Sequence, residues 1–452
     1  MLTMAQTRTA HRLEKRVLLP ADLEAVPSLQ EYIKGGGLEG LKKACNLTQQ
    51  DAIKFVKNSS LRGRGGAGFP AGVKWQTVFE DDAPKKYVVA NCAEGEPGTY
   101  KDRYLIGKNP YKLLEGMLIA TYAINATEAI IGIKAKFKPQ VQRLKEAIAE
   151  LEAANVVEKG IFRLALGPDD YLFGEEKALL EVIDGRGAMP RLFPPYMIGV
   201  GYTPTQTNPT VVNNAETLSH LPGIFHNGIE WFKSLGCEDT PGTMIITLSG
   251  DVKHPGMYEI GLGITLRELL YDIGGGPVSE RPFKAVFSGV ANAVATPEQF
   301  DTLLGFGSMR SAGIGLGSGG FMVYDQSRSM VQIAHMFSKF LSESSCGQCL
   351  PCSMGTRVIT EHLANFKNDK ATKKDIDAIR IEAGRCTNQT RCFLPAQESK
   401  LITSILDKFG NEFDATINTS MSYDKDLVLP KIDSFDEERQ QFIFERSKVI
   451  QY

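Results

Sequence analysis

Four cysteines near the C-terminal end of the chain have the spacing of iron-sulfur ligands. Three of them recur at every third residue of one short loop and the fourth follows much later: Cys346, Cys349, Cys352 and Cys392. Thiolates in this arrangement bind a 4Fe-4S cluster, which carries one electron at a time. Gly347 and Pro351 are expected to keep the loop out of helix, so that its backbone wraps around a small inorganic core. The loop therefore predicts a redox centre, and the rest of the chain must provide its electrons.

Zinc is the main alternative for this cysteine set. Zinc sites more often use two separated Cys-x-x-Cys pairs, or pairs mixed with His, and the six histidines of this chain form no ligand pair at helical spacing. Disulfides and coincidental spacing are the remaining alternatives. The triplet favours the cluster over all three.

A glycine-rich stretch at 61–75 has the composition of a loop that approaches a ligand closely. Gly63, Gly65 and Gly68 satisfy the G-x-G-x-x-G pattern, but no predicted strand precedes them, so the pattern is not by itself a Rossmann fingerprint. The glycines allow backbone N–H groups to face a planar or phosphorylated ligand. The stretch also offers positive charge and a stacking ring, from Arg62, Arg64, Lys74 and Phe69. A flexible surface loop is the alternative interpretation.

Carboxylates follow two of the predicted strands. The apolar strand 86–90 ends in a polar loop at 91–103 that contains Glu94 and Glu96. Ligands of α/β sheets bind beyond the carboxyl ends of strands, which is where this loop falls. Glu175 and Glu176 begin a later helix, where they either cap its N-terminus or bind ribose hydroxyls.

Length and composition exclude several function classes. The 452 residues carry a formal net charge of -2 and no long Lys/Arg block, which argues against nucleic acid or an anionic membrane as the main partner. The longest apolar run, Met117–Ile133, is interrupted by Asn125 and Glu128 and cannot span a bilayer unaided. The N-terminal residues are basic but lack an apolar core segment, so they are not expected to form a secretory signal. Eight cysteines, four of them in ligand spacing, fit the reducing cytoplasm better than a disulfide framework.

Apolar periodicity predicts five regions. Residues 1–60 are expected to form an N-terminal helical cap and 61–242 a wound α/β domain. Residues 243–325 show the hairpin, helix and strand of a small α+β module, and 326–418 are helical and lead into the cysteine loop. The tail 419–452 predicts an extension over the surface or onto a partner. In the α/β region the expected strands and helices are 86–90, 113–125, 129–133, 139–154 and 161–165.

Five segments, in order, resemble one known family: Gly63 to Trp75, Asn91 to Arg103, Tyr171 to Leu180, Pro209 to Leu218 and the cysteine loop. The family is the NADH-oxidising flavoprotein subunit of respiratory complex I (NuoF type), which recurs in NAD-linked hydrogenases, formate dehydrogenases and electron-bifurcating complexes. The resemblance implies a Rossmann-like FMN-binding domain at 61–242, a ubiquitin-like β-grasp (SLBB) domain at 243–325 and a C-terminal helical bundle with a 4Fe-4S cluster. It also implies the activity of an NADH dehydrogenase, in which a hydride passes from NADH to FMN and single electrons pass to the cluster.

The resemblance also assigns residues. The loop over the cofactors comprises Gly63, Arg64, Gly65, Gly66, Ala67, Gly68 and Gly72. The residues implied to hold FMN or line its site are Lys74, Asn91, Glu94, Tyr171, Asn213 and Asn214. Glu96 is implied to lie near the nicotinamide as the catalytic residue. The NADH ribose and adenine contacts are implied to be Glu175, Glu176, Phe69 and Tyr196. Cys392 rather than Cys386 is the implied fourth cluster ligand, because Cys392-Phe-Leu fits the family's Cys-x-Leu.

The chain departs from the family at the nucleotide pocket. Ala93 stands where the family has a carboxylate, Phe193 replaces a Lys, Thr77 replaces an aromatic residue, and Lys177 follows the Glu pair in place of a small polar residue. Losing a charge-assisted contact costs about 1.5–3 kcal/mol, which corresponds to a tenfold or larger loss of affinity. The alternative hypothesis is therefore a diverged paralogue that no longer oxidises NADH and serves as an electron relay or structural subunit.

The resemblance implies partners as well. They are a thioredoxin-fold 2Fe-2S subunit and further iron-sulfur subunits of a multisubunit redox complex. The protein is expected in the cytoplasm, with any attachment to the inner membrane made through that complex.

Overall fold

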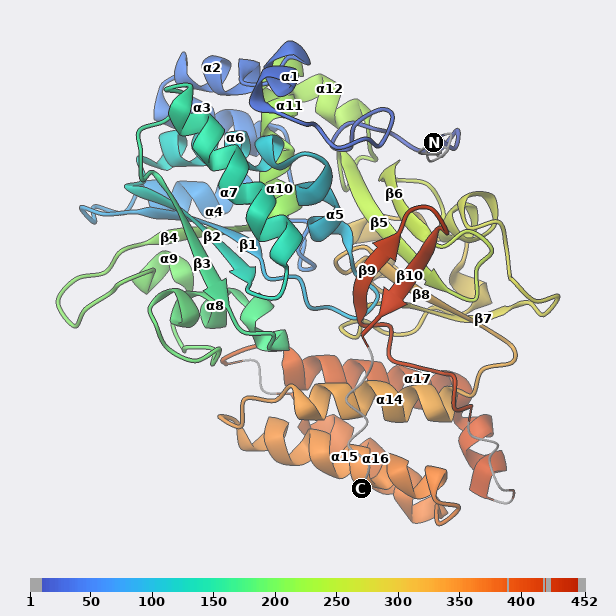
Figure 1. Cartoon of the computed structure of the whole chain (residues 1–452). Helices are drawn as coiled ribbons and strands as arrows, with labels where there is room; N and C mark the ends of the chain where they lie inside the picture. Colours follow the sequence, from blue (N-terminus) through green and yellow to red (C-terminus); the bar gives the residue numbers. More distant parts are fainter. Residues whose placement is uncertain (1–9, 388–389, 418, 420–423, 446–452) are drawn as a thin grey trace.

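The computed structural model describes residues 10–387, 390–417, 419 and 424–445. It contains an α/β region with a parallel sheet, a second sheet of mixed direction and a helical bundle (Figure 1). This confirms the predicted fold class. The first nine residues of the predicted cap and residues 446–452 of the predicted extension lie outside the described residues.

The first sheet has the strand order β3-β2-β1-β4, with every pair parallel. Its strands are β1 (Tyr87–Cys92), β2 (Glu128–Lys134), β3 (Phe162–Gly167) and β4 (Thr210–Asn214). Strands buried on both faces have nearly continuous apolar sequences, as β1 and β2 do. Val88, Ala129 and Val211 occupy paired positions and face one layer of helices. The next residues of these strands face the opposite layer.

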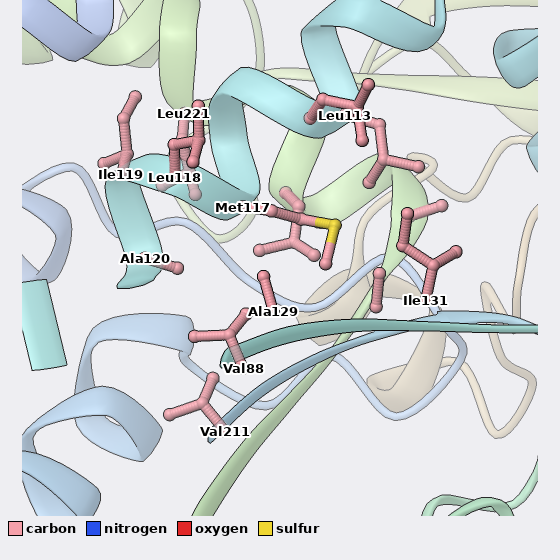
Figure 2. Packing of buried hydrophobic residues seen from close by; sticks show 14 of the residues in the cluster. Val88, Leu113, Met117, Leu118, Ile119, Ala120, Ala129, Ile131, Val211 and Leu221 are labelled. Atoms are coloured by element: carbon pink, nitrogen blue, oxygen red, sulfur yellow. The ribbon is translucent and has the colours of Figure 1, made fainter. Parts of the chain in front are cut away.

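Figure 2 shows the first of these layers, in which α6 (Pro110–Ile124) packs on the sheet. The side chain of Asn109 accepts a hydrogen bond from the N–H of Lys112, and Pro110 occupies the first turn, where its missing N–H costs nothing. The same layer contains α4 (Ala71–Phe79) and α7 (Lys138–Ala153), and the opposite layer contains α8 (Glu176–Ile183). The remaining helices of this region are α1 (Leu29–Lys34), α2 (Glu39–Cys45), α3 (Gln49–Asn58), α5 (Lys101–Lys108), η1 (Tyr171–Gly174), α9 (Pro195–Ile198), α10 (Ala215–Ser219), α11 (Leu221–Asn227) and α12 (Ile229–Ser234).

The second sheet has the order β6-β5-β8-β7. Its strands are β5 (Thr243–Gly250), β6 (Gly256–Gly261), β7 (Phe283–Ser288) and β8 (Gly320–Asp325). The β5–β6 hairpin, the short helix η2 (Glu268–Ile273) and β7 follow the predicted order. The sequence prediction missed the central strand β8, which pairs parallel with β5 and antiparallel with β7. The module also contains η3 (Pro297–Gln299) and α13 (Phe306–Ser311).

The C-terminal bundle consists of α14 (Met330–Glu343), α15 (Leu350–Lys367), α16 (Lys373–Arg385) and α17 (Leu394–Ile417). Its amphipathic helices bury one apolar core, and the cysteine loop joins α14 to α15. Cys349 is the N-terminal cap residue of α15, and Pro351 lies in its first turn. The expectation that Pro351 keeps the loop out of helix is therefore wrong, because proline is well accommodated in a first helical turn.

A C-terminal strap, residues 424–445, returns from the bundle to the α/β region (Figure 1). It contains the hairpin of β9 (Ile432–Asp436) and β10 (Gln441–Phe444), whose Phe435 and Phe442 pack near Ile245 of β5. The described part of the predicted extension, residues 424–445, thus lies over the chain's own surface. No helix in the described ranges is long and apolar enough to cross a bilayer, and the apolar run Met117–Ile133 is divided between α6 and β2.

Candidate functional site

The parallel sheet has a switch point between β1 and β4. The chain runs from β1 outward through β2 and β3 and then returns to place β4 on the other side of β1. A crevice forms beyond the carboxyl ends of strands at such a point and is the usual ligand site of an open α/β sheet. Asn91, the next-to-last residue of β1, pairs with Asn214 at the end of β4, and Asn213 is the residue before Asn214. The structure thus brings the three predicted FMN-binding asparagines together.

The glycine loop lies over these strand ends. A Cβ on Gly65 would lie 3.1 Å from the Cβ of Asn214, so the loop backbone approaches the end of β4 closely. Gly66 and Gly68 have φ angles of 126° and 66°, which favour glycine, and Phe306 of the second sheet's module packs against Gly68. The loop follows helix α3, so the G-x-G-x-x-G pattern is not a Rossmann fingerprint.

Two of the predicted loop residues have structural reasons for their identity. Arg64 is fully buried, and its guanidinium donates to the carbonyls of Pro241 (2.6 Å) and Thr243 (3.1 Å). It therefore fastens the loop to the second sheet. A Cβ on Gly72 would lie 2.6 Å from the backbone N of Lys57, so this glycine permits α4 to pack on α3. Among the other loop residues, Phe69 is half exposed and Ala67 is exposed.

Lys74 and the two consecutive glutamates meet at the edge of the crevice. The Lys74 amine lies 2.9 Å from the Glu176 carboxylate and 3.0 Å from the Val212 carbonyl of β4. Glu175 caps α8 by accepting hydrogen bonds from the N–H groups of Lys177 (2.9 Å) and Ala178 (3.0 Å). Burial raises the pKa of Glu175 to about 7. Glu175 therefore caps the N-terminus of α8, which is one of the two roles predicted for the glutamate pair. Glu176 instead pairs with Lys74, which follows the glycine loop in the chain.

The loop after β1 holds its two glutamates in different ways. Glu94 forms a buried ion pair with Arg103 (2.7 Å). Glu96 accepts hydrogen bonds from the Tyr171 hydroxyl (2.6 Å) and from the N–H of Val290 (2.6 Å) in the second sheet's module. Burial raises the pKa of Glu96, and these two hydrogen bonds oppose the rise. Glu96 is therefore fixed between η1 and the second sheet.

The four predicted ligands line one small cavity. Its wall also contains Leu172 of η1 and Ser345, whose hydroxyl lies 3.2 Å from the Cys352 sulfur. Within the described ranges, no three or more His, Cys, Asp or Glu side chains form a site for a single metal ion. Burial raises the pKa of Cys392 to about 12, so its thiolate needs a bound cation or cluster to become the stable form. The donor set and the cavity fit a polynuclear cluster.

Cys386 does not line this cavity. Its thiol donates to the Pro351 carbonyl (3.2 Å), and a Cβ on Gly355 would lie 2.4 Å from its sulfur. Cys386 thus packs against α15 as a buried side chain.

The departures from the family pattern are mostly at the surface. Phe193 and Tyr196 are 53% and 44% exposed, like Phe69 at 52%, so three aromatic rings are available to a planar ligand. The Thr77 hydroxyl donates to the Val73 carbonyl within α4. Ala93 is buried against the sheet.

Sequence reasoning missed two residues that join the crevice to the cysteine cavity. Leu172 lies in the cavity wall, and the side-chain oxygen of Gln397 on α17 lies 3.3 Å from the Tyr171 hydroxyl. Neither residue has a charge or a motif that distinguishes it from an ordinary helix residue. Their role depends on the packing of η1 against the bundle.

The C-terminal strap binds the loop after β1. The N–H of Gly98 donates to the Pro430 carbonyl (2.7 Å), and Arg103 donates to the Ile432 carbonyl (2.8 Å). We expect deletion of residues 424–452 to weaken FMN binding about tenfold, because the loop that carries Glu94 and Glu96 loses these contacts and its preorganisation. Fluorescence titration with FMN measures the effect.

The matched control for this deletion is Glu437→Gln, which breaks only the outer ion pair of the strap with Lys108 (2.8 Å). This variant should bind FMN as the unaltered protein does. Equal FMN affinity of the deletion variant and the full chain would contradict a positioning role of the strap.

The fold and the site define a class of protein: a redox subunit with a ligand site at the strand ends of an α/β sheet and four iron-sulfur-type cysteines in a helical bundle. Family models match in the same order. The Nuo51 FMN-binding domain matches residues 56–223, the SLBB domain 245–283, and the NADH-ubiquinone oxidoreductase-F iron-sulfur binding region 332–416.

The chain belongs to the family of NADH-quinone oxidoreductase F subunits. It is 36% identical to the second NADH-quinone oxidoreductase F subunit of Rhizobium meliloti, over 86% of this chain and 94% of that protein. It is 34% identical to the HndC subunit of the NADP-reducing hydrogenase of Solidesulfovibrio fructosivorans, over 86% of this chain and 81% of that protein. The crystal structure of an NAD+-reducing NiFe-hydrogenase in the H2-reduced state matches with a TM-score of 0.77 at 32% identity, over 87% of this chain and 67% of that chain.

These relations confirm the resemblance seen in the sequence. The protein is an NADH dehydrogenase module, its cofactors are FMN and a 4Fe-4S cluster, and its relatives are subunits of multisubunit complexes. The iron-sulfur family model excludes the zinc interpretation of the cysteine loop.

Proposed function

We propose that FMN binds in the crevice between β1 and β4, beneath the glycine loop. FMN held there would supply the conversion between two-electron hydride transfer from NADH and one-electron transfer to the cluster. Asn91, Asn213 and Asn214 line the strand ends, and the backbone of Gly65 and Gly66 covers them. Lys74 provides a positive charge for the flavin, and Glu176 orients that amine.

The observation that carries this proposal is the position of η1 between the two redox sites. Asn91 at the crevice donates to the Gly174 carbonyl (2.7 Å), and Tyr171 donates to Glu96. Leu172, which lies between Tyr171 and Gly174 in the chain, forms part of the cysteine cavity wall. The single turn η1 thus contacts both the proposed FMN site and the cysteine cavity. Their closeness supports direct electron transfer from the flavin to the cluster.

We further propose that NADH approaches over the exposed face of the glycine loop. Phe69, Phe193 and Tyr196 offer rings for the adenine, and Glu96 orients the nicotinamide. Phe193 replaces a charged contact of the family by an apolar one, so stacking provides more of the binding here. Cys346, Cys349, Cys352 and Cys392 hold the cluster.

We propose that iron-sulfur partners dock around the cysteine cavity. Three apolar side chains beside the ligands are strongly exposed: Leu350 (71%), Met354 (51%) and Phe393 (64%). Such residues are typical of interfaces. The partners include a thioredoxin-fold 2Fe-2S subunit and further iron-sulfur subunits of a cytoplasmic complex, which attaches to the inner membrane through other chains.

NADH-driven reduction of ferricyanide or a viologen dye by the FMN-loaded protein tests the activity. We expect turnover that depends on both FMN and NADH. The absence of turnover in protein with intact FMN would contradict the proposed site.

A further inference from the structure

Glu398 is a carboxyl group in the apolar interior of the bundle that has no place in the mechanism above. It lies on α17 and is fully buried. One carboxylate oxygen accepts a hydrogen bond from the Ser338 hydroxyl (2.6 Å), and the other has no hydrogen-bond partner in the part of the chain that the structure describes. An ionised carboxylate in this position is strongly disfavoured. Burial accordingly raises the pKa of Glu398 to about 8, so the group is neutral at pH 7.

A series of hydroxyl groups connects Glu398 with the cysteine cavity. The Ser338 hydroxyl lies 2.8 Å from that of Thr360, which donates to the Thr356 carbonyl (2.8 Å). The Thr356 hydroxyl in turn donates to the carbonyl of Cys352 (2.9 Å), a residue of the cavity wall. Cys352, Thr356 and Thr360 are spaced four residues apart and therefore share one face of α15. This polar face crosses an otherwise apolar core.

Among the described residues, the groups that interact with Glu398 carry no positive charge. Ser338 of α14 donates its hydrogen bond, and the thiols of Cys352 on α15 and Cys386 on α16 interact with it through charge. Burial raises the pKa of both thiols, and the negative charge of Glu398 adds to the rise, so negative charge on a thiol and negative charge on Glu398 disfavour each other. Glu382 of α16 adds to this effect at Cys386. Negative charge added to the cluster therefore disfavours ionisation of Glu398.

We propose that Glu398 is the proton-accepting group linked to reduction of the 4Fe-4S cluster, an inference that rests on ligation of the cluster by Cys352. In the pH range where Glu398 is ionised beside the oxidised cluster, one-electron reduction of the cluster by the flavin would be accompanied by uptake of one proton from solvent onto the Glu398 carboxylate, which forms its O–H bond. The charge of the bundle interior is then unchanged by the electron. Glu398 acts through its charge and does not bind the cluster.

The sign of the pH dependence follows from this linkage. An added electron raises the pKa of Glu398 above its value beside the oxidised cluster. Below both pKa values the group is protonated in either redox state, so the cluster potential is independent of pH. Between them, reduction takes up a proton, and the potential falls as pH rises. Burial raises the pKa of Glu398 to about 8, and the negative charge of the oxidised cluster raises it further. The cluster potential should therefore begin to fall at about pH 8 or higher.

Redox titration of the cluster in the holoprotein, followed by electron paramagnetic resonance between roughly pH 6 and pH 10, tests the proposal. Glu398→Gln keeps the size and the hydrogen bond to Ser338 but cannot take up a proton, so its potential should be constant over this range. Glu361→Gln is the matched control, because Glu361 is an exposed carboxylate on α15 and its variant should behave as the unaltered protein does. Ser338→Ala removes the donor that stabilises the charged form and should move the start of the fall to higher pH.

Infrared difference spectra give a second readout. At a pH where the potential falls, reduction should produce a protonated-carboxyl C=O band in the unaltered protein and none in Glu398→Gln. A constant potential in the unaltered protein, or the same pH dependence in Glu398→Gln, would overturn the proposal. Absence of the cluster signal itself would instead contradict the thiolate ligation on which the proposal rests.

Discussion

Replacement of Cys392 by serine is expected to abolish the 4Fe-4S cluster. Cys392 lines the cavity together with Cys346, Cys349 and Cys352, so the variant retains only three thiolates around the inorganic core. The serine hydroxyl does not supply the soft anionic ligand that iron-sulfur clusters require. Iron and acid-labile sulfide content, together with the visible absorption of the anaerobically purified protein, measure the loss. We expect nearly all of the cluster to be missing.

Cys386→Ser is the matched control for this change. Cys386 is also buried in the bundle, but its thiol faces the Pro351 carbonyl outside the cavity. Serine can donate the same hydrogen bond, so iron and sulfide should remain at the level of the unaltered protein. Loss of the cluster in Cys386→Ser, with retention in Cys392→Ser, would assign the fourth ligand to Cys386.

Glu96→Gln is expected to lower kcat/KM for NADH by about tenfold to a hundredfold, the range that corresponds to loss of one charge-assisted contact of about 1.5–3 kcal/mol. Glutamine can still accept from the N–H of Val290 and can donate to the Tyr171 hydroxyl, so the loop should keep its position. The change removes only the negative charge proposed to orient the nicotinamide. Stopped-flow reduction of the bound flavin by NADH measures the effect.

FMN content and dithionite reduction of the cluster are the controls for Glu96→Gln, and both should be unchanged. An unaltered rate of flavin reduction would show that the charge of Glu96 has no part in the reaction. A loss of FMN would instead assign Glu96 to flavin binding.

The sequence predicted the elements whose signals are local. The parallel strands are apolar runs followed by turn residues, and the predicted strands 129–133 and 161–165 agree with β2 and β3 to within one or two residues at each end. β8 was missed because it is buried throughout and follows a glycine-rich segment, so it lacks the alternation of an exposed strand. Its place is set by pairing with β5 and β7, which are distant in sequence.

The candidate site shows the same division between local and tertiary signals. The cysteine spacing and the glycine loop are visible in the sequence, whereas the position of η1 between crevice and cavity depends on how the bundle packs on the α/β region. The buried state of Arg64 was not predicted, because an arginine in a glycine-rich loop gives no sign that backbone carbonyls of the second sheet enclose it. The charged tail likewise gave no sign that its backbone binds Arg103.

The account depends most on electron transfer from NADH through the flavin crevice to the four-thiol cavity. The direct test is to add NADH anaerobically to protein that contains both FMN and the cluster, and to record flavin absorption and the electron paramagnetic resonance of the cluster together. We predict that the flavin bleaches and that the signal of the reduced cluster develops after it. A cluster that dithionite reduces but NADH leaves oxidised, in protein with bound FMN, would contradict the account.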